Sequence, residues 1–273
     1  MSQLPTQRSS GHRARKRFGQ NFLVSESVIQ NILRALNPGE DQHIIEIGPG
    51  LGALTKPLVE SGTSLCTIEL DRDLAERLNQ QFGSEKNFQL INQDVLKVDL
   101  ASIFGNGKGL RIIGNLPYNI STPILFHLLK QKAPIEDMLF MLQREVVDRM
   151  GAEPGTSDFG RLSVMIQYRC DVESLISVPP GSFDPPPKVH SAVVRLRPRP
   201  PELEATSEAM LDRIVRSAFG TRRKTLRNCL KNELSADAIE SLGIDPGLRP
   251  ENLSVAEFVK LANCASLNDK HPK

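Results

Sequence analysis

The chain has 273 residues, 39% of them hydrophobic and 24% charged, with a formal net charge of +2 at pH 7, which suits one large globular domain with a smaller one beside it. No stretch reaches the roughly 18 consecutive apolar residues of a membrane span, and the polar, basic start lacks the apolar core of a secretory signal, so we expect a cytoplasmic protein without a membrane partner. The four cysteines and five histidines are scattered without ligand spacing, which favours reduced thiols and no metal site.

Residues 1–20 form a predicted basic arm, since five Lys or Arg and no acid lie between Arg8 and Arg17. Beyond the arm, apolar runs predict strands, and amphipathic spacing predicts helices. The expected strands are 43–47, 64–70, 88–91, 110–113, 138–142, 173–178 and 192–196; the expected helices are 25–36, 52–60, 71–82, one with Pro123 in its first position, and 161–168. This alternation predicts a doubly wound, mostly parallel sheet flanked by helices.

Eight of the 19 prolines lie between Pro179 and Pro201, and we end the main domain, 21–200, at the last of these breaks. Residues 201–273 are predicted to form a small all-α domain with helices at 207–219, 222–231, 235–242 and 254–265, the last with a capping box of Ser254 and Glu257. Seven basic residues and no acid lie between Arg213 and Lys231. Two acid-free runs indicate a polyanionic partner, although a single run is usually a solvated surface.

A glycine-rich loop, 46–52 (Glu-Ile-Gly-Pro-Gly-Leu-Gly), follows the first strand of the main domain. Glycine lets the backbone turn sharply and approach a ligand, but this G-x-G-x-G spacing differs from the dinucleotide-binding pattern and by itself fits a tight turn equally well. Glu69 ends the second strand, roughly where a carboxylate that binds ribose hydroxyls is expected. Asp94 follows the third strand, where it is able to accept from an adenine amino group or to cap the next helix.

The tetrad Asn115-Leu116-Pro117-Tyr118 follows the fourth strand. The side-chain oxygen of Asn115 is suited to accept a hydrogen bond from an exocyclic amine. Pro117 fixes the local backbone and has no N–H of its own, so the Leu116 carbonyl is able to point at the same amine. Tyr118 offers a flat face for stacking. Ligands of open α/β sheets bind at the carboxyl ends of strands. The ordered set therefore predicts a pocket for a nucleoside-type cofactor, with a planar amine-bearing substrate beside it.

These motifs resemble those of class I (Rossmann-like) S-adenosylmethionine-dependent methyltransferases. Four further segments, 17–23, 115–123, 183–189 and 222–228, resemble the small-subunit ribosomal RNA adenine dimethyltransferase family, KsgA/RsmA. The resemblance implies methyl transfer from S-adenosylmethionine, leaving S-adenosylhomocysteine, to N6 of two adjacent adenines in the 3′-terminal hairpin loop of small-subunit ribosomal RNA. It implies N6,N6-dimethyladenosine as the product, formed during small-subunit biogenesis, with this RNA and the small-subunit precursor as partners. We expect a monomer.

The resemblance also implies roles for individual residues. The cofactor site would be formed by Asn21, Leu23, Gly48, Gly50, Glu69, Asp94 and Asn115. The target adenine would be held by Asn115, the Leu116 carbonyl and Tyr118, with Pro117 and Phe183 beside it. The helical domain would dock on ribosomal RNA through Arg222, Arg223, Lys224 and Arg227.

Three alternatives to this function stay open at this point. A related enzyme that methylates an adenine of large-subunit RNA would share the cofactor motifs, but the Pro-Pro-Pro-Lys-Val segment at 185–189 favours the small-subunit family. Protein glutamine methyltransferases also use an Asn-x-Pro-Tyr site, usually written Asn-Pro-Pro-Tyr. An RNA-binding assembly factor with a methyltransferase fold is the non-enzymatic alternative, and the presence of Glu69, Asp94 and Asn115 argues against an inactive enzyme.

Overall fold

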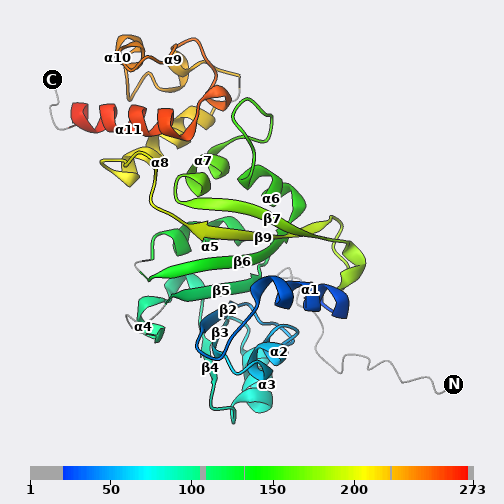
Figure 1. Ribbon diagram of the computed structural model, residues 1–273. Coiled ribbons are helices and arrows are strands. Elements are labelled where there is room, and N and C mark those ends of the chain that lie inside the picture. The colour runs from blue at the N-terminus through cyan, green and yellow to red at the C-terminus, as the bar shows by residue number, and fades with distance from the viewer. Residues whose placement is uncertain (1–20, 105–108, 132, 222, 270–273) are drawn as a thin grey trace.

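The computed structural model describes residues 21–104, 109–131, 133–221 and 223–269. A seven-stranded sheet with the order β4-β3-β2-β5-β6-β9-β7 crosses its middle (Figure 1). Its strands are β2 (His43–Ile47), β3 (Ser64–Glu69), β4 (Phe88–Asn92), β5 (Leu110–Asn115), β6 (Ile135–Gln143), β7 (Cys170–Val178) and β9 (Ser191–Pro198). The first five pair in parallel, whereas β9 pairs antiparallel with both β6 and β7. The predicted doubly wound, mostly parallel sheet is confirmed.

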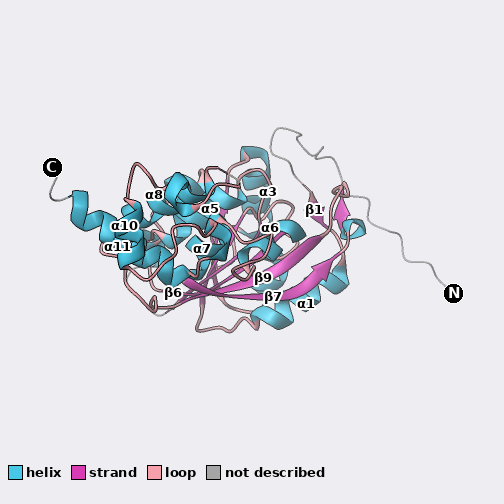
Figure 2. Ribbon diagram, turned by 90° about the horizontal axis from the view of Figure 1, so that it is seen from above, coloured by secondary structure: helices cyan, strands magenta, loops and turns pink. Residues whose placement is uncertain are grey.

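Helices cover both faces of this sheet (Figure 2). They are α1 (Glu26–Leu36), α2 (Thr55–Glu60), α3 (Arg72–Phe82), α4 (Ala101–Phe104), α5 (Ser121–Leu129), α6 (Arg144–Met150) and α7 (Arg161–Gln167). Alternate residues of the central strands point to opposite faces, so Ile44 and Ile113 pack with α1 and α2, while Ile45 and Ile112 pack with α5, α6 and α7. The apolar runs of the sequence are thus buried on both sides, as parallel strands require.

Four helices differ from the sequence prediction by more than one residue, and one of them, expected at 254–265, continues to Asp269. The other three differ at their starts or in their lengths. The helix expected at 52–60 begins only at Thr55, because Gly48, Gly50 and Gly52 have φ of +67°, +59° and +86° and hold the chain outside the helical region. Pro123 occupies the third rather than the first position of α5, which is still within the turn whose N–H groups lack helical acceptors. The third difference is the helix expected at 222–231.

Of the described part of that expected helix, 223–231, only Leu226–Cys229 is α-helical, as α9. Arg223 has a φ of +75°, which an α-helix does not accommodate. The N–H groups of Leu226 and Arg227 donate instead to the carbonyls of Leu248 and Pro246, at 2.9 and 3.0 Å. A neighbouring loop therefore replaces the preceding helical turn that the sequence pattern predicted.

The C-terminal helices α8 (Glu208–Phe219), α9, α10 (Ala236–Ser241) and α11 (Val255–Asp269) lie beyond the β7 edge of the sheet (Figure 1). Their buried residues form a separate hydrophobic cluster. The predicted capping box is confirmed, since Glu257 N–H donates to Ser254 Oγ at 3.2 Å and Ser254 N–H donates to the Glu257 carboxylate at 2.8 Å. Phe159, Val164 and Tyr168, from around α7, belong to the same cluster, so this core extends to residues before the predicted boundary at 200.

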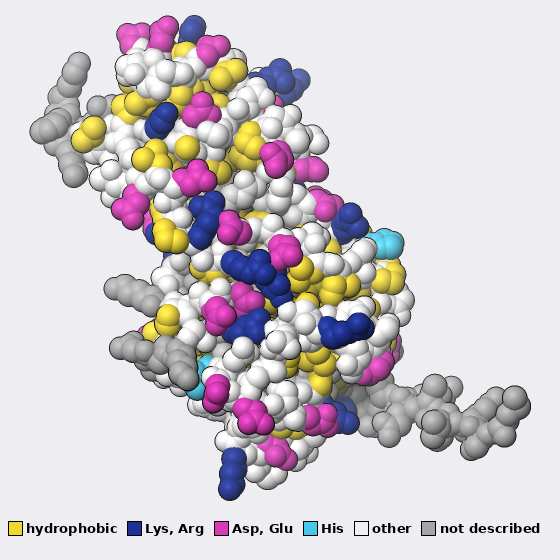
Figure 3. Space-filling model, in the orientation of Figure 1, with side chains coloured by type: hydrophobic (Ala, Val, Ile, Leu, Met, Phe, Trp, Pro, Cys, Tyr) yellow, Lys and Arg dark blue, Asp and Glu magenta, His cyan; other side chains and the backbone are white. Residues whose placement is uncertain are grey.

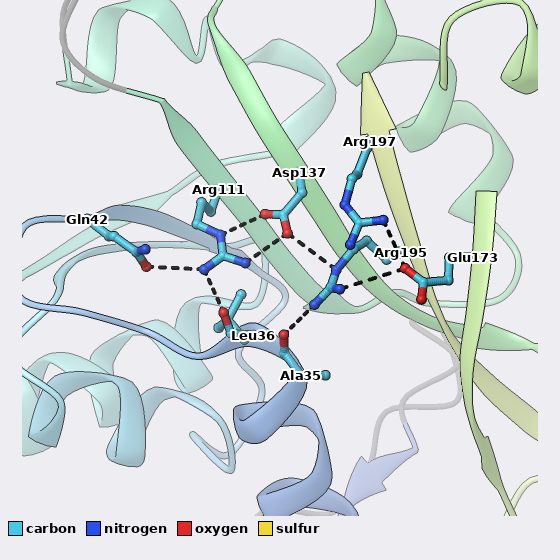
Figure 4. A network of polar contacts seen from close by, with 8 residues as sticks. All are labelled: Ala35, Leu36, Gln42, Arg111, Asp137, Glu173, Arg195 and Arg197. Atoms are coloured by element: carbon cyan, nitrogen blue, oxygen red, sulfur yellow. Dashed lines mark hydrogen bonds and ion pairs between the residues drawn. The ribbon is translucent and has the colours of Figure 1, made fainter. Parts of the chain in front are cut away.

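A buried network of charges joins α1 to the sheet (Figure 4). Arg111 of β5 donates to both carboxylate oxygens of Asp137 of β6, at 2.7 and 2.8 Å, and to the Leu36 carbonyl at 2.6 Å. Arg195 of β9 donates to the Ala35 carbonyl and pairs with Asp137. The two guanidinium groups satisfy carbonyls at the C-terminus of α1, where the helix dipole favours positive charge. The network therefore fixes the helix that follows residues 21–24.

Candidate active site

A cavity of about 230 Å³ opens at the carboxyl ends of β2, β3, β4 and β5, where the topology predicts ligand binding. It brings together nine of the residues expected from the sequence: Asn21, Gly48, Gly50, Glu69, Asp94, Asn115, Leu116, Pro117 and Tyr118. Residues that the sequence analysis did not single out complete its lining: Phe22, Ile47, Ile68, Leu70, Asp71, Gln93, Val95, Asn119, Ile120 and Ile124. One cavity thus holds both parts of the predicted pocket.

The glycine loop forms one wall of the cavity and is tightly packed at Gly50. A Cβ at Gly50 would lie 3.1 Å from the Phe22 ring, so this ring packs directly on the loop. Gly114, inside β5, is also needed for space, since a Cβ there would lie 2.5 Å from the Ile47 carbonyl oxygen. Glycine at positions 50 and 114 is therefore required by close packing against Phe22 and the Ile47 backbone.

Glu69 links this loop to the next helix. Its carboxylate accepts from the Gly50 N–H at 3.2 Å and from the Asp71 N–H at 2.9 Å, and burial raises its pKa despite these bonds. Asp94 accepts from the Leu96 N–H at 3.0 Å and so caps a short 3₁₀ helix, Val95–Lys97, while also lining the cavity. Each oxygen of a carboxylate has two lone pairs, so both groups retain acceptor capacity for ligand hydroxyl or amino groups.

The side-chain amide of Asn115 has a defined orientation. Its Nδ2 lies 3.0 Å from the carbonyl oxygen of Asn21. A carbonyl oxygen only accepts, so the nitrogen must face it, and Oδ1 is left as the acceptor of the amide. Asn115 is the last residue of β5, and the neighbouring Leu116 N–H donates to the Met141 carbonyl at 3.3 Å, which fixes the backbone of the tetrad. The acceptor expected from the sequence is therefore oriented by a residue 94 positions earlier in the chain.

Tyr118 is half-buried at the cavity, and its hydroxyl lies 2.6 Å from Ser191 Oγ at the start of β9. Burial raises the pKa of Tyr118, and the bond to Ser191 opposes this rise. The phenol is therefore neutral at physiological pH, and its ring is anchored by the contact with Ser191.

Two predicted site residues lie outside this cavity. Leu23 and Phe183 are buried in the core on the α1 side of the sheet, at 6% and 3% exposure. They pair in a small antiparallel sheet of β1 (Phe22–Leu23) and β8 (Phe183–Asp184), which no sequence signal indicated because each strand has only two residues. Leu23 instead lines a smaller cavity beside the main one.

Two of the lining residues missed by sequence reasoning had a usable signal. In the sequence, Leu70 directly follows the predicted Glu69, and Phe22 lies between the predicted residues Asn21 and Leu23. In the structure Leu70 is 49% exposed. Leu70 and Phe22 add apolar surface to the cavity mouth. Gln93 and Asn119 are exposed polar residues at the cavity, and they adjoin the predicted Asp94 and Tyr118.

The second basic run is divided in space. Arg213 pairs with Glu233 at 3.9 Å and Arg216 with Asp212 at 2.6 Å, so acids just outside the run neutralise its first part. Arg223, Lys224 and Arg227 are exposed, and no ion pair involves them among the described residues. Arg222 and the N-terminal basic residues lie outside those residues. On the face seen in Figure 3, basic and acidic side chains are intermixed.

Within the described residues, no helix is long and apolar enough to cross a membrane. No group of three or more His, Cys, Asp or Glu side chains in the described ranges is placed to hold a metal ion.

Comparison with known proteins identifies the family. The family model "Ribosomal RNA adenine dimethylase" matches residues 11–267. A protein of Pseudomonas aeruginosa named "Ribosomal RNA small subunit methyltransferase A" is 57% identical over 254 residues, which cover 92% of this chain and 94% of that protein. A protein of the same name from Dechloromonas aromatica is 55% identical over 257 residues, covering 94% and 99%.

Solved structures agree with this assignment. A dimethyladenosine transferase from Plasmodium falciparum has a TM-score of 0.74 at 25% identity and covers 88% of this chain and 95% of its own. The 23S rRNA methyltransferase ErmE has a TM-score of 0.67 at 25% identity, covering 90% and 100%. The predicted class I methyltransferase fold and enzyme class are confirmed. Because the family model spans almost the whole chain, this protein belongs to the ribosomal RNA adenine dimethylase family.

Proposed function

We propose that the protein transfers methyl groups from S-adenosylmethionine to N6 of two adjacent adenines in the 3′-terminal hairpin loop of small-subunit ribosomal RNA. The observation that carries this proposal is the orientation of Asn115, whose amide nitrogen is held by the Asn21 carbonyl so that its oxygen acts as an acceptor at the cavity. An acceptor beside a stacking ring, at one end of a nucleoside-sized cavity, suits the amino group of a flipped-out adenine.

The residues of the cavity fit the proposed cofactor. Glu69 and Asp94 offer carboxylate oxygens to ribose hydroxyls and to an adenine amino group, and Leu70 and Val95 offer apolar surface to a purine ring. Gly48 and Gly50 both have positive φ and carry no side chain, so a ligand is able to approach the backbone of this loop closely. The bound cofactor supplies an electrophilic methyl group on its sulfonium.

The chemical problem is that the lone pair of adenine N6 is delocalised into the ring. If Asn115 Oδ1 and the Leu116 carbonyl oxygen each accept one N6 hydrogen, the nitrogen is biased towards a tetrahedral geometry, and its lone pair becomes available. Catalysis then comes mainly from positioning and preorganised dipoles. The nitrogen is positively charged after attack and acidic enough to lose its proton to water, so these residues need not include a strong base.

Tyr118 is the residue that stacks on the target base after the base has left the RNA stack. A loop adenine is easier to unstack than a paired one, and an aromatic side chain stabilises the extruded base by about 1–3 kcal/mol. The hydrogen bond to Ser191 fixes the ring before the base arrives. In the second methylation one N6 hydrogen is already replaced, so one of the two acceptors loses its partner and the pocket must accommodate a methyl group.

Sequence similarity supports small-subunit RNA over large-subunit RNA as the substrate. The chain is 57% identical to a protein named for small-subunit methylation but 25% identical to ErmE, named for 23S rRNA. We place the dimethylation during assembly of the small subunit, in the cytoplasm, by a monomer that docks through its helical segment 201–273 and its N-terminal arm 1–20. Phe183 enters this proposal as a support for β1 and the base site rather than as a wall of the cavity.

The test is transfer of labelled methyl groups to small ribosomal subunits that lack their normal methylation, with large subunits and a glutamine-containing release-factor protein as parallel substrates. We expect N6,N6-dimethyladenosine in the small subunit alone. Label in large subunits or in the protein would overturn the proposed substrate. No label anywhere, together with tight binding to small subunits, would favour the assembly-factor alternative.

A further inference from the structure

Glu46, the last residue but one of β2, is a buried carboxyl group that the proposed chemistry does not use. It is 2% exposed, and its carboxyl oxygen accepts a hydrogen bond from the hydroxyl of Thr55, itself fully buried, at 2.7 Å. A carboxylate in such a place is costly unless a positive charge accompanies it. Within the described ranges, no Lys, Arg or His forms an ion pair with Glu46.

Among the described residues, the elements packed against Glu46 add no positive charge. Glu69 faces it from β3 with a further negative charge, and α2 presents the neutral Thr55 hydroxyl. On β5 the residue in register is Ile113, and the segment before α1 presents Phe22 and Leu23. The side chain is therefore an acid among apolar groups and one other acid.

Glu46 also borders the smaller cavity beside the proposed cofactor site. This smaller cavity has a volume of about 40 Å³, and it shares Phe22, Gly48, Gly50 and Asn115 with the larger one. A water molecule occupies about 30 Å³ of liquid, so the space suits a group of the size of an ammonium. Apart from Glu46, its lining is apolar side chains, glycine backbone and Asn115.

We propose, on the basis of the proposed function, that the Glu46 carboxyl is the counter-charge for the α-ammonium group of the cofactor and releases its proton to solvent when the cofactor binds. The carboxylic acid loses one proton, and the resulting carboxylate forms an ion pair with the ammonium. No other bond forms or breaks. Cofactor uptake is thereby coupled to pH through a residue that touches neither the methyl group nor the target base.

The protonation state of the empty site agrees with this coupling. Burial raises the pKa of Glu46 to about 8, the hydrogen bond from Thr55 opposes the rise, and the charge of Glu69 adds to it. At neutral pH the empty site thus holds mostly the protonated acid. An adjacent cation lowers a carboxyl pKa, so between the lowered value and about 8 binding releases a proton and becomes up to about tenfold tighter per pH unit.

The test is calorimetry at pH 7 in two buffers of different ionisation enthalpy, which counts protons released on binding. The probes are S-adenosylhomocysteine, which carries the α-ammonium, and 5′-methylthioadenosine, which lacks the whole amino-acid end. We expect wild-type protein to release close to one proton more with the first probe than with the second. Because both probes contain the ribose, any contribution from Glu69 cancels in this comparison.

Two variants separate charge from hydrogen bonding. Glu46→Gln keeps an oxygen that accepts from Thr55 but has no proton to release, so both probes should release the same number and the affinity for S-adenosylhomocysteine should not change between pH 6 and 8. Thr55→Val removes the hydrogen bond and keeps the acid, so proton release should persist. Equal release with the two probes in wild type, or unchanged release in Glu46→Gln, would overturn the coupling while leaving the proposed function intact. Failure of S-adenosylhomocysteine to bind at all would overturn both.

Discussion

At the carboxyl ends of β2 to β5, residues from distant parts of the chain meet around one cavity; Asn21 and Asn115 are 94 positions apart and share a hydrogen bond. The basic residues between Arg213 and Lys231 are neighbours in sequence, yet the fold divides them into residues paired with acids and residues exposed without an ion pair among the described residues. In the first region hydrogen bonds within the fold hold Glu69, Asn115 and Tyr118 in place. In the second region the ion pairs of Arg213 and Arg216 are made with acids that lie outside the basic run. The fold therefore fixes the positions of side chains at the strand ends more closely than those of the exposed basic residues.

The strongest test of the first region is Asn115→Ala. It removes the oriented acceptor, so we expect kcat for methyl transfer to fall by about 10²–10³-fold, as when one preorganised group of an active site is lost. Binding of S-adenosylhomocysteine should remain measurable, because the glycine loop and Glu69 are unchanged. Near-normal turnover in this variant would contradict the proposed role of the amide.

The basic cluster is tested by comparing two sets of substitutions. Replacing Arg223, Lys224 and Arg227 together by Ala should weaken binding to ribosomal RNA and reduce the slope of log affinity against log salt by about 2, since each phosphate contact contributes roughly 0.7–0.9. The matched control replaces Arg213 and Arg216, which already pair with Glu233 and Asp212, and should change the slope by less per residue. If the slope of log affinity against log salt changed equally per replaced residue in the two variants, the ion pairs of Arg213 and Arg216 would not prevent these residues from contacting RNA.

Tyr118 allows stacking and anchoring to be separated. Tyr118→Ala should weaken engagement of target RNA by about 1–3 kcal/mol, the usual value for a lost base-stacking partner, as measured by apparent affinity in steady-state kinetics. Tyr118→Phe keeps the ring and loses only the bond to Ser191, so its effect should be smaller, about 0.5–1.5 kcal/mol. Loss of cofactor affinity in Tyr118→Ala, with RNA engagement unchanged, would place the ring on the cofactor side of the cavity.

The smallest effect concerns the stability of the protein without cofactor. The pKa of Glu46 is about 8 when folded and 4.5 for an ordinary glutamate, so the folded protein binds the extra proton between these values. The free energy of unfolding contributed by this group is therefore present below about pH 4.5 and is lost as pH rises through 8.

The Glu46→Gln variant does not lose this free energy of unfolding as pH rises, because a glutamine side chain does not titrate. In denaturant titrations of wild type and variant at pH 5, 6, 7 and 8, the stability of the variant relative to wild type should increase at each step. A constant difference across this range would show that Glu46 does not carry its proton in the empty site.

The sequence by itself determined the kind of fold and most of the site. The order of strands and helices follows from apolar runs and amphipathic spacing, which depend only on local periodicity, and β2 matches its predicted bounds at 43–47. Gly48, Gly50, Glu69, Asp94 and the tetrad from Asn115 were identifiable because each sits at a strand end, and parallel topology brings such ends to one edge.

Only the tertiary structure decided how these side chains are oriented and which distant residues form hydrogen bonds, ion pairs or strand pairs. The two-residue strands β1 and β8 are too short for periodicity, and their pairing buries Leu23 and Phe183, which the sequence placed in the site. Arg111 interrupts an apolar run, and only its contacts with Asp137 and the Leu36 carbonyl explain a buried charge there. The helix expected at 222–231 is shorter in the structure, because the N–H groups of Leu226 and Arg227 donate to carbonyls of the loop at 246–248. Hydrogen bonds and ion pairs between distant segments have no local sequence period, so they become visible only once the chain is folded.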